Sequence, residues 1–157
     1  MRHIYRIASL NINGIANPTR IRTLGEFLWQ QDIDVVLLQE VTSKAIEQLR
    51  NYTKHINIGT EHRGTEILVK DGIQINNIIC LPSGRGIAGV LEGIHMIKIY
   101  APSGAAKKEE RKPFTTKTYY HYCQPRTSKY YWLAILTAPW TRRTQQTTLR
   151  QVRHWQY

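Results

Sequence analysis

The feature that most constrains the fold is a run of consecutive apolar residues, Val35-Val36-Leu37-Leu38, which ends in the polar pair Gln39-Glu40. A strand at the surface of a sheet alternates apolar and polar residues, whereas a continuous apolar run is typical of a strand buried on both faces. Such a strand needs a covering layer on each side of its sheet. The run therefore predicts a layered α/β protein, and it makes the polar end of this strand conspicuous.

The segments around this run fit a layered α/β protein. Ile4 to Leu10 alternates in a β-rich pattern, which predicts a strand that ends in Asn11-Ile12-Asn13-Gly14. Asn17-Pro18 supplies an N-cap and a proline at the first position of a helix that ends near Gln31. Ser43 to Tyr52 predicts a second helix. The chain thus begins with the order strand, helix, strand, helix.

Two hairpins and a tail without periodicity follow these elements. The first predicted hairpin pairs Gly64 to Val69 with Gly72 to Cys80 around the turn Lys70-Asp71-Gly72, and the second pairs Arg85 to Leu91 with Ile94 to Tyr100 around Glu92-Gly93. From about Lys117 onward, the sequence shows neither helical nor strand periodicity. We assign that tail no architecture.

The positive charge of the chain, +11 overall, is concentrated near its C-terminal end. Residues 1–106 hold 11 Lys or Arg and 9 Asp or Glu, whereas residues 107–157 hold 11 and 2. A strongly basic balance usually indicates a nucleic acid or another anionic surface as the partner. A break this sharp also needs a cause, and a basic nucleic-acid-binding tail is only one candidate.

Several classes of protein find no support in the sequence. No apolar run approaches the roughly 20 residues that span a bilayer, and the N-terminal residues do not form a secretory signal. Cys80 and Cys123 are isolated, without the spacing of a zinc site or a disulfide framework. We therefore expect an intracellular protein, nuclear or cytoplasmic, with reduced thiols and no membrane partner.

Candidate functional residues follow three of the predicted strands. Asn11 and Glu40 end two neighbouring strands, where α/β proteins commonly place functional groups, and their oxygens are of the kind that Mg²⁺ prefers. The alternative is that Asn11 and Asn13 shape a turn and that Glu40 is an ordinary strand-end carboxylate. Similarly, Tyr100-Ala101-Pro102-Ser103-Gly104 offers groups for a phosphate or simply ends a strand in a turn. Taken singly, each pattern favours the ordinary structural explanation.

The combination of these motifs is more informative. Asn11-Ile12-Asn13-Gly14, then Gln39-Glu40, then Tyr100-Ala101-Pro102-Ser103-Gly104 together resemble the endonuclease/exonuclease/phosphatase family, especially the endonuclease of LINE-type (non-LTR) retrotransposons. The resemblance runs from about Ile4 to Arg111. It implies that residues 1–111 are the N-terminal part of the family's domain. The expected fold is a partial four-layer α/β sandwich of the DNase I-like type.

The resemblance also implies a chemistry, that of a Mg²⁺-dependent DNA endonuclease, with a reverse transcriptase as partner in the parent element. Asn11 would orient the scissile phosphate or a metal-bound water and stands as a second metal ligand. Glu40 would ligate the metal, and Tyr100 would contact the phosphate. Asn13 and Ser103 are candidate phosphate-binding residues. Ser103 departs from the asparagine often found at this position, which puts its role in doubt.

Two motifs that the family needs for hydrolysis do not occur in these 157 residues, Gly-Asp-Phe-Asn and Ser-Asp-His. In the family, an Asp activates the attacking water and a His binds the phosphate. Loss of a general base alone removes on the order of 10² to 10⁴ in rate. We therefore expect a truncated, inactive relative in which Mg²⁺ binding is weak or lost.

The genetic code offers a reason for both the missing motif and the basic tail. From the third base of Trp132 to Arg142, permitted codons read two bases out of phase yield Ala-Gly-Asp-Phe-Asn-Cys-Thr-Leu-Asp-Pro-Ala. The preceding Lys129-Tyr130-Tyr131 can yield Ile-Leu-Leu. This pattern indicates a change of frame between about Arg111 and Lys117. Residues 112–157 would then be a non-native, poorly ordered tail whose charge is a by-product.

Two further interpretations remain open. The first is a non-enzymatic module that binds DNA or RNA through basic residues and interleaved aromatics, and steep salt dependence without cleavage would favour it. The second is a relic of a mobile element with no selected function, which an intact frame after a one-base correction would support.

Overall fold

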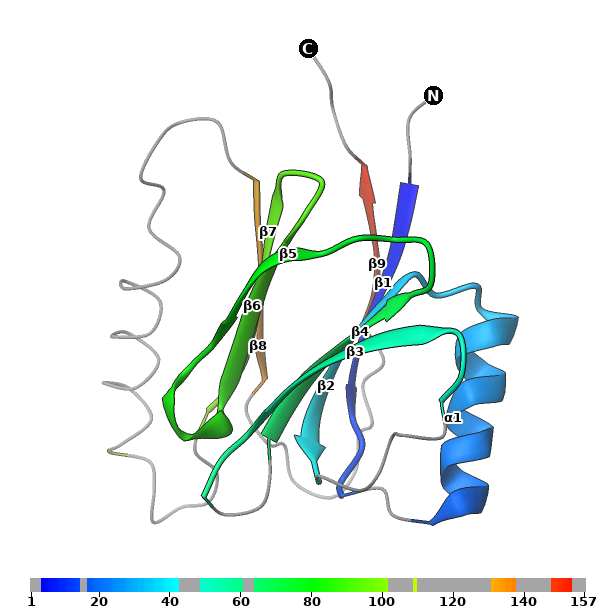
Figure 1. Cartoon of the computed structure of the whole chain (residues 1–157), viewed down its shortest axis with the longest axis horizontal. Helices are drawn as coiled ribbons and strands as arrows, with labels where there is room; N and C mark the ends of the chain where they lie inside the picture. The colour runs from blue at the N-terminus through cyan, green and yellow to red at the C-terminus, as the bar shows by residue number, and fades with distance from the viewer. Residues whose placement is uncertain are drawn as a thin grey trace.

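The computed structural model describes residues 4–14, 17–42, 49–60, 64–101, 109, 131–137 and 148–153. These residues form two β-sheets that face each other, with one helix on the outer face of the first sheet (Figure 1). The first sheet has the strand order β3-β4-β2-β1-β9, and the second has the order β5-β6-β7-β8. In the described part of the chain, no helix has the length and apolar character needed to cross a bilayer.

The elements have the following bounds. The first sheet consists of β1 (Ile4–Asn11), β2 (Val35–Val41), β3 (Tyr52–Ile58), β4 (Gly64–Lys70) and β9 (Thr148–Arg153), and the second of β5 (Asn76–Cys80), β6 (Gly86–Leu91), β7 (Ile94–Tyr100) and β8 (Tyr131–Thr137). The helices are α1 (Pro18–Gln30) and the short 3-10 turn η1 (Pro82–Gly84).

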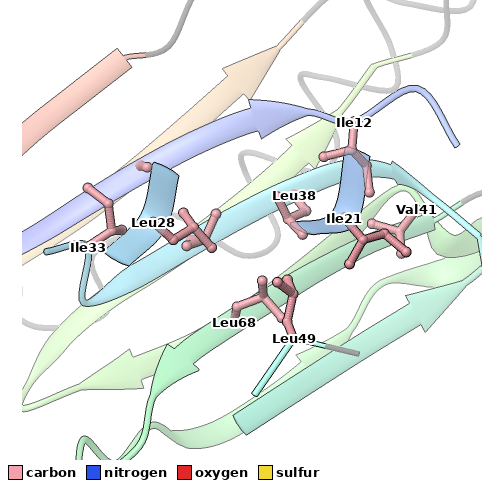
Figure 2. Close-up of a cluster of buried hydrophobic side chains, with 10 residues drawn as sticks. Ile12, Ile21, Leu28, Ile33, Leu38, Val41, Leu49 and Leu68 are labelled. Carbon is pink, nitrogen blue, oxygen red and sulfur yellow. The ribbon is translucent and has the colours of Figure 1, made fainter. Parts of the chain in front are cut away.

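The apolar run Val35-Val36-Leu37-Leu38 lies between two cores. Val36 and Leu38 of β2 pack against α1, in a cluster that also holds Leu28 (Figure 2). Val35 and Leu37 point the other way, into the core between the two sheets. Every residue of β2 is buried. Since burying one such side chain contributes roughly 1.5–3 kcal/mol, this strand anchors both layers, and the predicted α/β sandwich is confirmed.

The beginning of the chain forms as the sequence predicts. β1 and β2 are parallel, with Asn11 opposite Gln39, as expected for strands joined by a helical crossover. The Asn17 side chain accepts a hydrogen bond from the Thr19 backbone N–H at 2.8 Å, so it caps α1 as predicted. The second predicted hairpin is confirmed as well: β6 and β7 are antiparallel around Glu92-Gly93.

The first predicted hairpin is wrong. β4 pairs with β2 and β3 of the first sheet, whereas β5 pairs with β6 of the second. The turn after Lys70 therefore sends the chain across from one sheet to the other. Ile73 and Ile75 pack against the core between the sheets along this path. Partial burial of these isoleucines favours the crossing over the local hairpin.

Two other expectations differ from the structure. The helix predicted for Ser43 to Tyr52 cannot reach its predicted end, because Tyr52 begins β3, and residues 43–48 lie outside the described residues. The tail shows no periodicity in its sequence, yet its described residues include two strands: β8 is parallel to β7, and β9 is antiparallel to β1.

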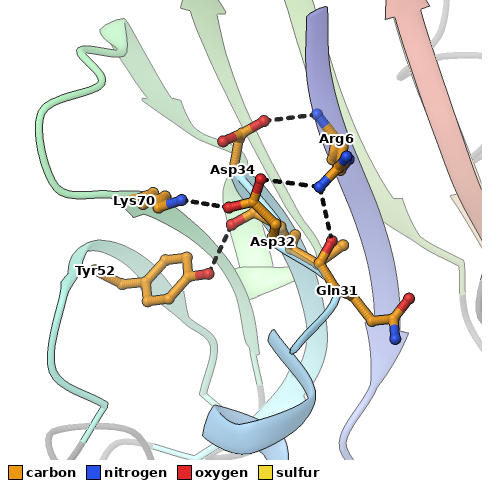
Figure 3. Close-up of polar contacts among 7 residues, drawn as sticks. Arg6, Gln31, Asp32, Asp34, Tyr52 and Lys70 are labelled. Carbon is orange, nitrogen blue, oxygen red and sulfur yellow. Dashed lines mark hydrogen bonds and ion pairs between the residues drawn. The ribbon is translucent and has the colours of Figure 1, made fainter. Parts of the chain in front are cut away.

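A polar network closes the end of the first sheet where β1 and β2 begin. Asp32 binds the Arg6 guanidinium at 2.9 Å and the Lys70 ammonium at 2.7 Å, and the hydrogen bond from Lys70 is the main reason that the pKa of Asp32 is lowered (Figure 3). The Tyr52 hydroxyl donates to the Ile33 carbonyl at 2.6 Å. These contacts tie the end of α1 to three strands, and their exposure to solvent keeps the contribution of each ion pair small.

Glu66 is a buried carboxylic acid on β4. It lies opposite Leu38 of β2 and Ile56 of β3, and it is 1% exposed. Within the described part of the chain, its Oε2 atom has no hydrogen-bond partner. Burial raises the pKa of Glu66 from 4.5 to about 7, against a smaller opposite effect of the charge on Lys54.

We expect Glu66 to make the fold less stable as pH rises from about 4.5 to about 7. In this range the unfolded chain ionises Glu66 while the folded chain keeps the proton, so its contribution is fully present below about 4.5 and lost above about 7. Urea unfolding midpoints at pH 5 and pH 8 measure this effect. The change in midpoint between pH 5 and pH 8 should be smaller in Glu66→Gln than in the control variant Glu26→Gln, which alters an exposed carboxylate. Equal pH dependence in both variants would contradict the assignment.

Candidate metal and phosphate site

A break in the register of β2 aims Glu40 at the second sheet. Gln39 pairs with Thr65 of β4 and Val41 pairs with Gly64, so Glu40 is an extra residue between them, with a φ of 58°. A β-bulge of this kind redirects the side chain of the inserted residue. In a regular strand, Glu40 would point toward α1 as Leu38 does.

The redirected carboxylate joins two of the other predicted site residues. The Asn11 amide Nδ2 donates to Glu40 Oε1 at 2.9 Å, and the Tyr100 hydroxyl donates to the same oxygen at 2.9 Å. Glu40 is 7% exposed and Tyr100 is 9% exposed. The structure therefore brings together residues from β1, β2 and β7 that lie far apart in the sequence. We call Asn11, Glu40 and Tyr100 the Glu40 cluster.

The loop after β1 is held against the Glu40 cluster by the backbone. The Gly14 N–H donates to the Glu40 carbonyl at 2.8 Å, and the Asn13 N–H donates to Asn11 Oδ1 at 2.9 Å. Asn13 thus shapes the turn through its backbone, as the structural alternative predicted. A phosphate-binding role for the Asn13 side chain stays a prediction, and Ser103 lies outside the described residues.

Lys98 lies on β7 two residues before Tyr100, on the face that points toward the first sheet, and it was not predicted as a site residue. Its ammonium donates to the Ser9 hydroxyl at 2.9 Å and is fully buried. Burial lowers the pKa of Lys98 to about 7. A usable signal was present: in the strand Ile94–Tyr100, Lys98 has the same two-residue periodicity as Tyr100, which places both on one face.

Glu40 fits a magnesium ion better than Asn11 does. The Asn11 amide nitrogen faces Glu40, and its oxygen accepts from Asn13, so this oxygen is already engaged in the turn. Over the residues that the structure describes, no three His, Cys, Asp or Glu side chains gather as metal ligands. Mg²⁺ is often held by one or two carboxylates, with waters and substrate phosphates completing the shell. Metal ligation by Asn11 stays a prediction.

Arg85, which contacts Tyr100, is a second residue at this end of the sandwich that was not predicted as a site residue. Its guanidinium carbon lies 5.7 Å from the centre of the Tyr100 ring, and its carbonyl accepts a hydrogen bond from the Tyr100 N–H at 2.8 Å. A cation over an aromatic face is favourable, and arginine makes this contact more often than lysine. The Glu40 cluster therefore has a fixed positive charge beside it.

The fold is that of the endonuclease/exonuclease/phosphatase proteins. An AP endonuclease from Archaeoglobus fulgidus superposes with a TM-score of 0.65 at 18% identity, over 84% of this chain and 56% of its own. Danio rerio TDP2 in complex with a single-strand DNA product gives a TM-score of 0.64 at 16% identity, over 86% and 60%. A family member from Bacteroides thetaiotaomicron gives 0.61 at 12%, over 88% and 64%.

The chain therefore spans between 56% and 64% of the length of these three structures. No protein-family model matches the sequence. No curated protein matches it either.

We expect Glu40→Gly to be more stable than Glu40→Ala, because glycine adopts the positive φ at this position without the strain that alanine has. Both lose the carboxylate, but an alanine at a φ of 58° costs roughly 1–2 kcal/mol that glycine does not. Urea unfolding of both variants measures the difference. The pair Glu26→Gly and Glu26→Ala in α1 is the control, and it should show the opposite order by about 1 kcal/mol. Equal stability of the two Glu40 variants would argue against the bulge.

Proposed function

We propose that the Glu40 cluster is the divalent-metal and phosphate-binding part of a DNA phosphodiesterase site, and that these residues bind without catalysing hydrolysis. The observation that carries the proposal is the convergence of Asn11 and Tyr100 on one oxygen of Glu40. Two donors on one oxygen orient the carboxylate, which is what a ligand to a hard cation requires. Bound Mg²⁺ would supply charge neutralisation at the phosphodiester.

DNA is the proposed partner because the comparisons and the charge agree. The TDP2 structure contains a single-strand DNA product, and another similar structure, the 3' phosphatase NExo from Neisseria, is bound to a product DNA hairpin. In this chain, Arg85 gives the same end of the sandwich a positive charge beside Tyr100. Phosphate groups are the anions that a metal and an arginine would hold together.

The sequence of β8 argues against hydrolysis by these residues. A water nucleophile needs a proton acceptor within hydrogen-bond reach of the phosphate. The strand beside β7 is β8, in which Thr137 lies opposite Tyr100. Its sequence, Tyr-Trp-Leu-Ala-Ile-Leu-Thr, contains no Asp, Glu or His. The strand best placed to supply the base therefore carries none.

The origin of the proposed site is a retrotransposon endonuclease whose reading frame shifts after about Arg111. In the alternative frame, the Asp-Phe-Asn string spans the codons of Ala134 to Thr137. Those residues end β8, opposite Ile97 to Tyr100. The out-of-frame motif would thus lie next to Tyr100, which supports a catalytic strand in that position before the frame changed.

Sequencing the gene tests the frame change directly. We expect the codons of residues 132–142, read two bases out of phase, to encode Gly-Asp-Phe-Asn, with a one-base deletion or a two-base insertion near residues 111–117. The out-of-phase reading should continue downstream to Ser-Asp-His. A stop codon or an unrelated string in that frame would refute the retrotransposon origin while leaving the metal site untouched.

Manganese binding tests the metal site. We expect the full chain to bind Mn²⁺ in a way that depends on Glu40, as measured by the loss of the free-ion signal in electron paramagnetic resonance. Glu40→Gln should weaken this binding by at least roughly tenfold, because it removes the charge of the one carboxylate in the Glu40 cluster. Glu26→Gln, an exposed carboxylate on α1, is the matched control and should bind as the unaltered chain does.

A nicking assay separates binding from hydrolysis in the same preparations. Supercoiled plasmid incubated with Mg²⁺ should show no more nicking with the unaltered chain than with Glu40→Ala. Nicking that Glu40→Ala abolishes would overturn the proposal that hydrolysis is absent. Equal Mn²⁺ binding by the unaltered chain and Glu40→Gln would instead overturn the metal site.

A further inference from the structure

The turn between β5 and β6 is locked to the first sheet by one side chain. The Asn57 amide on β3 donates two hydrogen bonds across the gap, to the carbonyls of Leu81 and Gly86, both at 2.7 Å. The Leu81 N–H also donates to the Gly86 carbonyl at 2.9 Å, which closes the turn. Asn57 therefore holds both ends of the segment that contains Arg85.

The middle of the same turn is fixed by close packing. Gly84 has a φ of +68°, and a Cβ at this position would lie 2.1 Å from the backbone nitrogen of Gly59. Its carbonyl accepts a hydrogen bond from the Thr65 hydroxyl at 3.2 Å. Gly84 thus lies against the end of β3 and the start of β4, so the backbone next to Arg85 has a set position relative to the first sheet.

This lock sets where the Arg85 guanidinium lies. Tyr100 fixes it from the second sheet, through the ring contact at 5.7 Å and the backbone hydrogen bond at 2.8 Å. Asn57 fixes it from the first sheet, through the turn. Because contacts from both sheets hold the Arg85 side chain, it loses less conformational entropy when it binds a ligand than a mobile surface arginine does.

We propose that Arg85 binds a phosphate of the DNA backbone next to the Glu40 cluster, and that Asn57 is the positioning residue that holds Arg85 in place. The inference rests on the proposed function only in taking DNA as the partner. Stacking uses the face of a guanidinium group, whereas its N–H donors lie at the edge in the plane of the group. Two of these donors match two oxygens of one phosphate.

DNA binding without any divalent metal tests the role of Arg85. The assay is fluorescence anisotropy of a fluorescein-labelled DNA duplex with the full chain in EDTA, at several salt concentrations. Arg85→Ala should weaken binding roughly tenfold and reduce the slope of log K against log salt by about 1, as loss of one phosphate contact does. Arg22→Ala is the matched control, because it removes the same charge from an exposed position on α1.

Arg85→Lys and Asn57→Ala separate charge from position. Arg85→Lys keeps the charge without altering the turn, so it should keep the salt slope and lose part of the affinity. Asn57→Ala should weaken binding several-fold. In the Arg85→Ala background, Asn57→Ala should have no further effect, because the side chain that it positions is gone. A merely structural role of Asn57 would give equal losses in both backgrounds.

The inference is overturned if Arg85→Ala binds DNA no more weakly than Arg22→Ala, or if the effects of Asn57→Ala and Arg85→Ala add. Thermal unfolding of each variant checks that the chain still folds, and Arg85→Lys tests the contact even if Asn57→Ala does not fold. Because the assay contains EDTA, its outcome is independent of Mn²⁺ binding at Glu40. Failure of this inference and failure of the metal site are therefore distinguishable.

Discussion

The bulge between Gln39 and Val41 is the constraint on which the Glu40 cluster depends. In a regular strand without the bulge, Glu40 would share the face of Val36 and Leu38, and its carboxylate would lie in the apolar core under α1. The bulge costs roughly 1–2 kcal/mol in backbone conformation for a residue other than glycine. The two hydrogen bonds to Glu40 Oε1 contribute about 1 kcal/mol each and offset that cost. The backbone strain at Glu40 is therefore tolerated because Asn11 of β1 and Tyr100 of β7 hydrogen-bond to its carboxylate.

The side chains between the two sheets change from apolar to polar at one point along the strands. On β1 the inward residues are Tyr5 and Ile7, followed by Ser9 and Asn11, and on β7 they are Ile94 and Met96, followed by Lys98 and Tyr100. The apolar half contributes most of the packing between the sheets. The polar half joins the sheets by hydrogen bonds, from Lys98 to Ser9 and from Tyr100 to Glu40. Both strands switch at the same level, so the site forms without interrupting the core.

Local sequence patterns predicted the helices and strands more reliably than they predicted which strands pair with each other. The buried run of β2 and the capped start of α1 follow from neighbouring residues, so both were predictable. The separation of β4 from β5 was not, because it depends on Ile73 and Ile75 finding the distant core between the sheets. The motif resemblance assigned Asn11, Glu40 and Tyr100 to one metal and phosphate site. The bulge that joins them leaves no local signature, since a carboxylate at the end of a strand normally continues the alternation.

Arg85 and Lys98 show a different limit of the sequence. Both are basic residues within 15 positions of Tyr100, yet one is fully buried on Ser9 and the other lies over the Tyr100 ring. Their roles differ because a buried ammonium favours its neutral form, whereas a guanidinium stays charged in any environment found in proteins. Arg85 is thus the basic group suited to a phosphate, and Lys98 is suited to joining the sheets. Under the proposed function, Arg85 would keep an attraction for DNA even where β8 supplies no base, so binding and hydrolysis could be lost independently in this architecture.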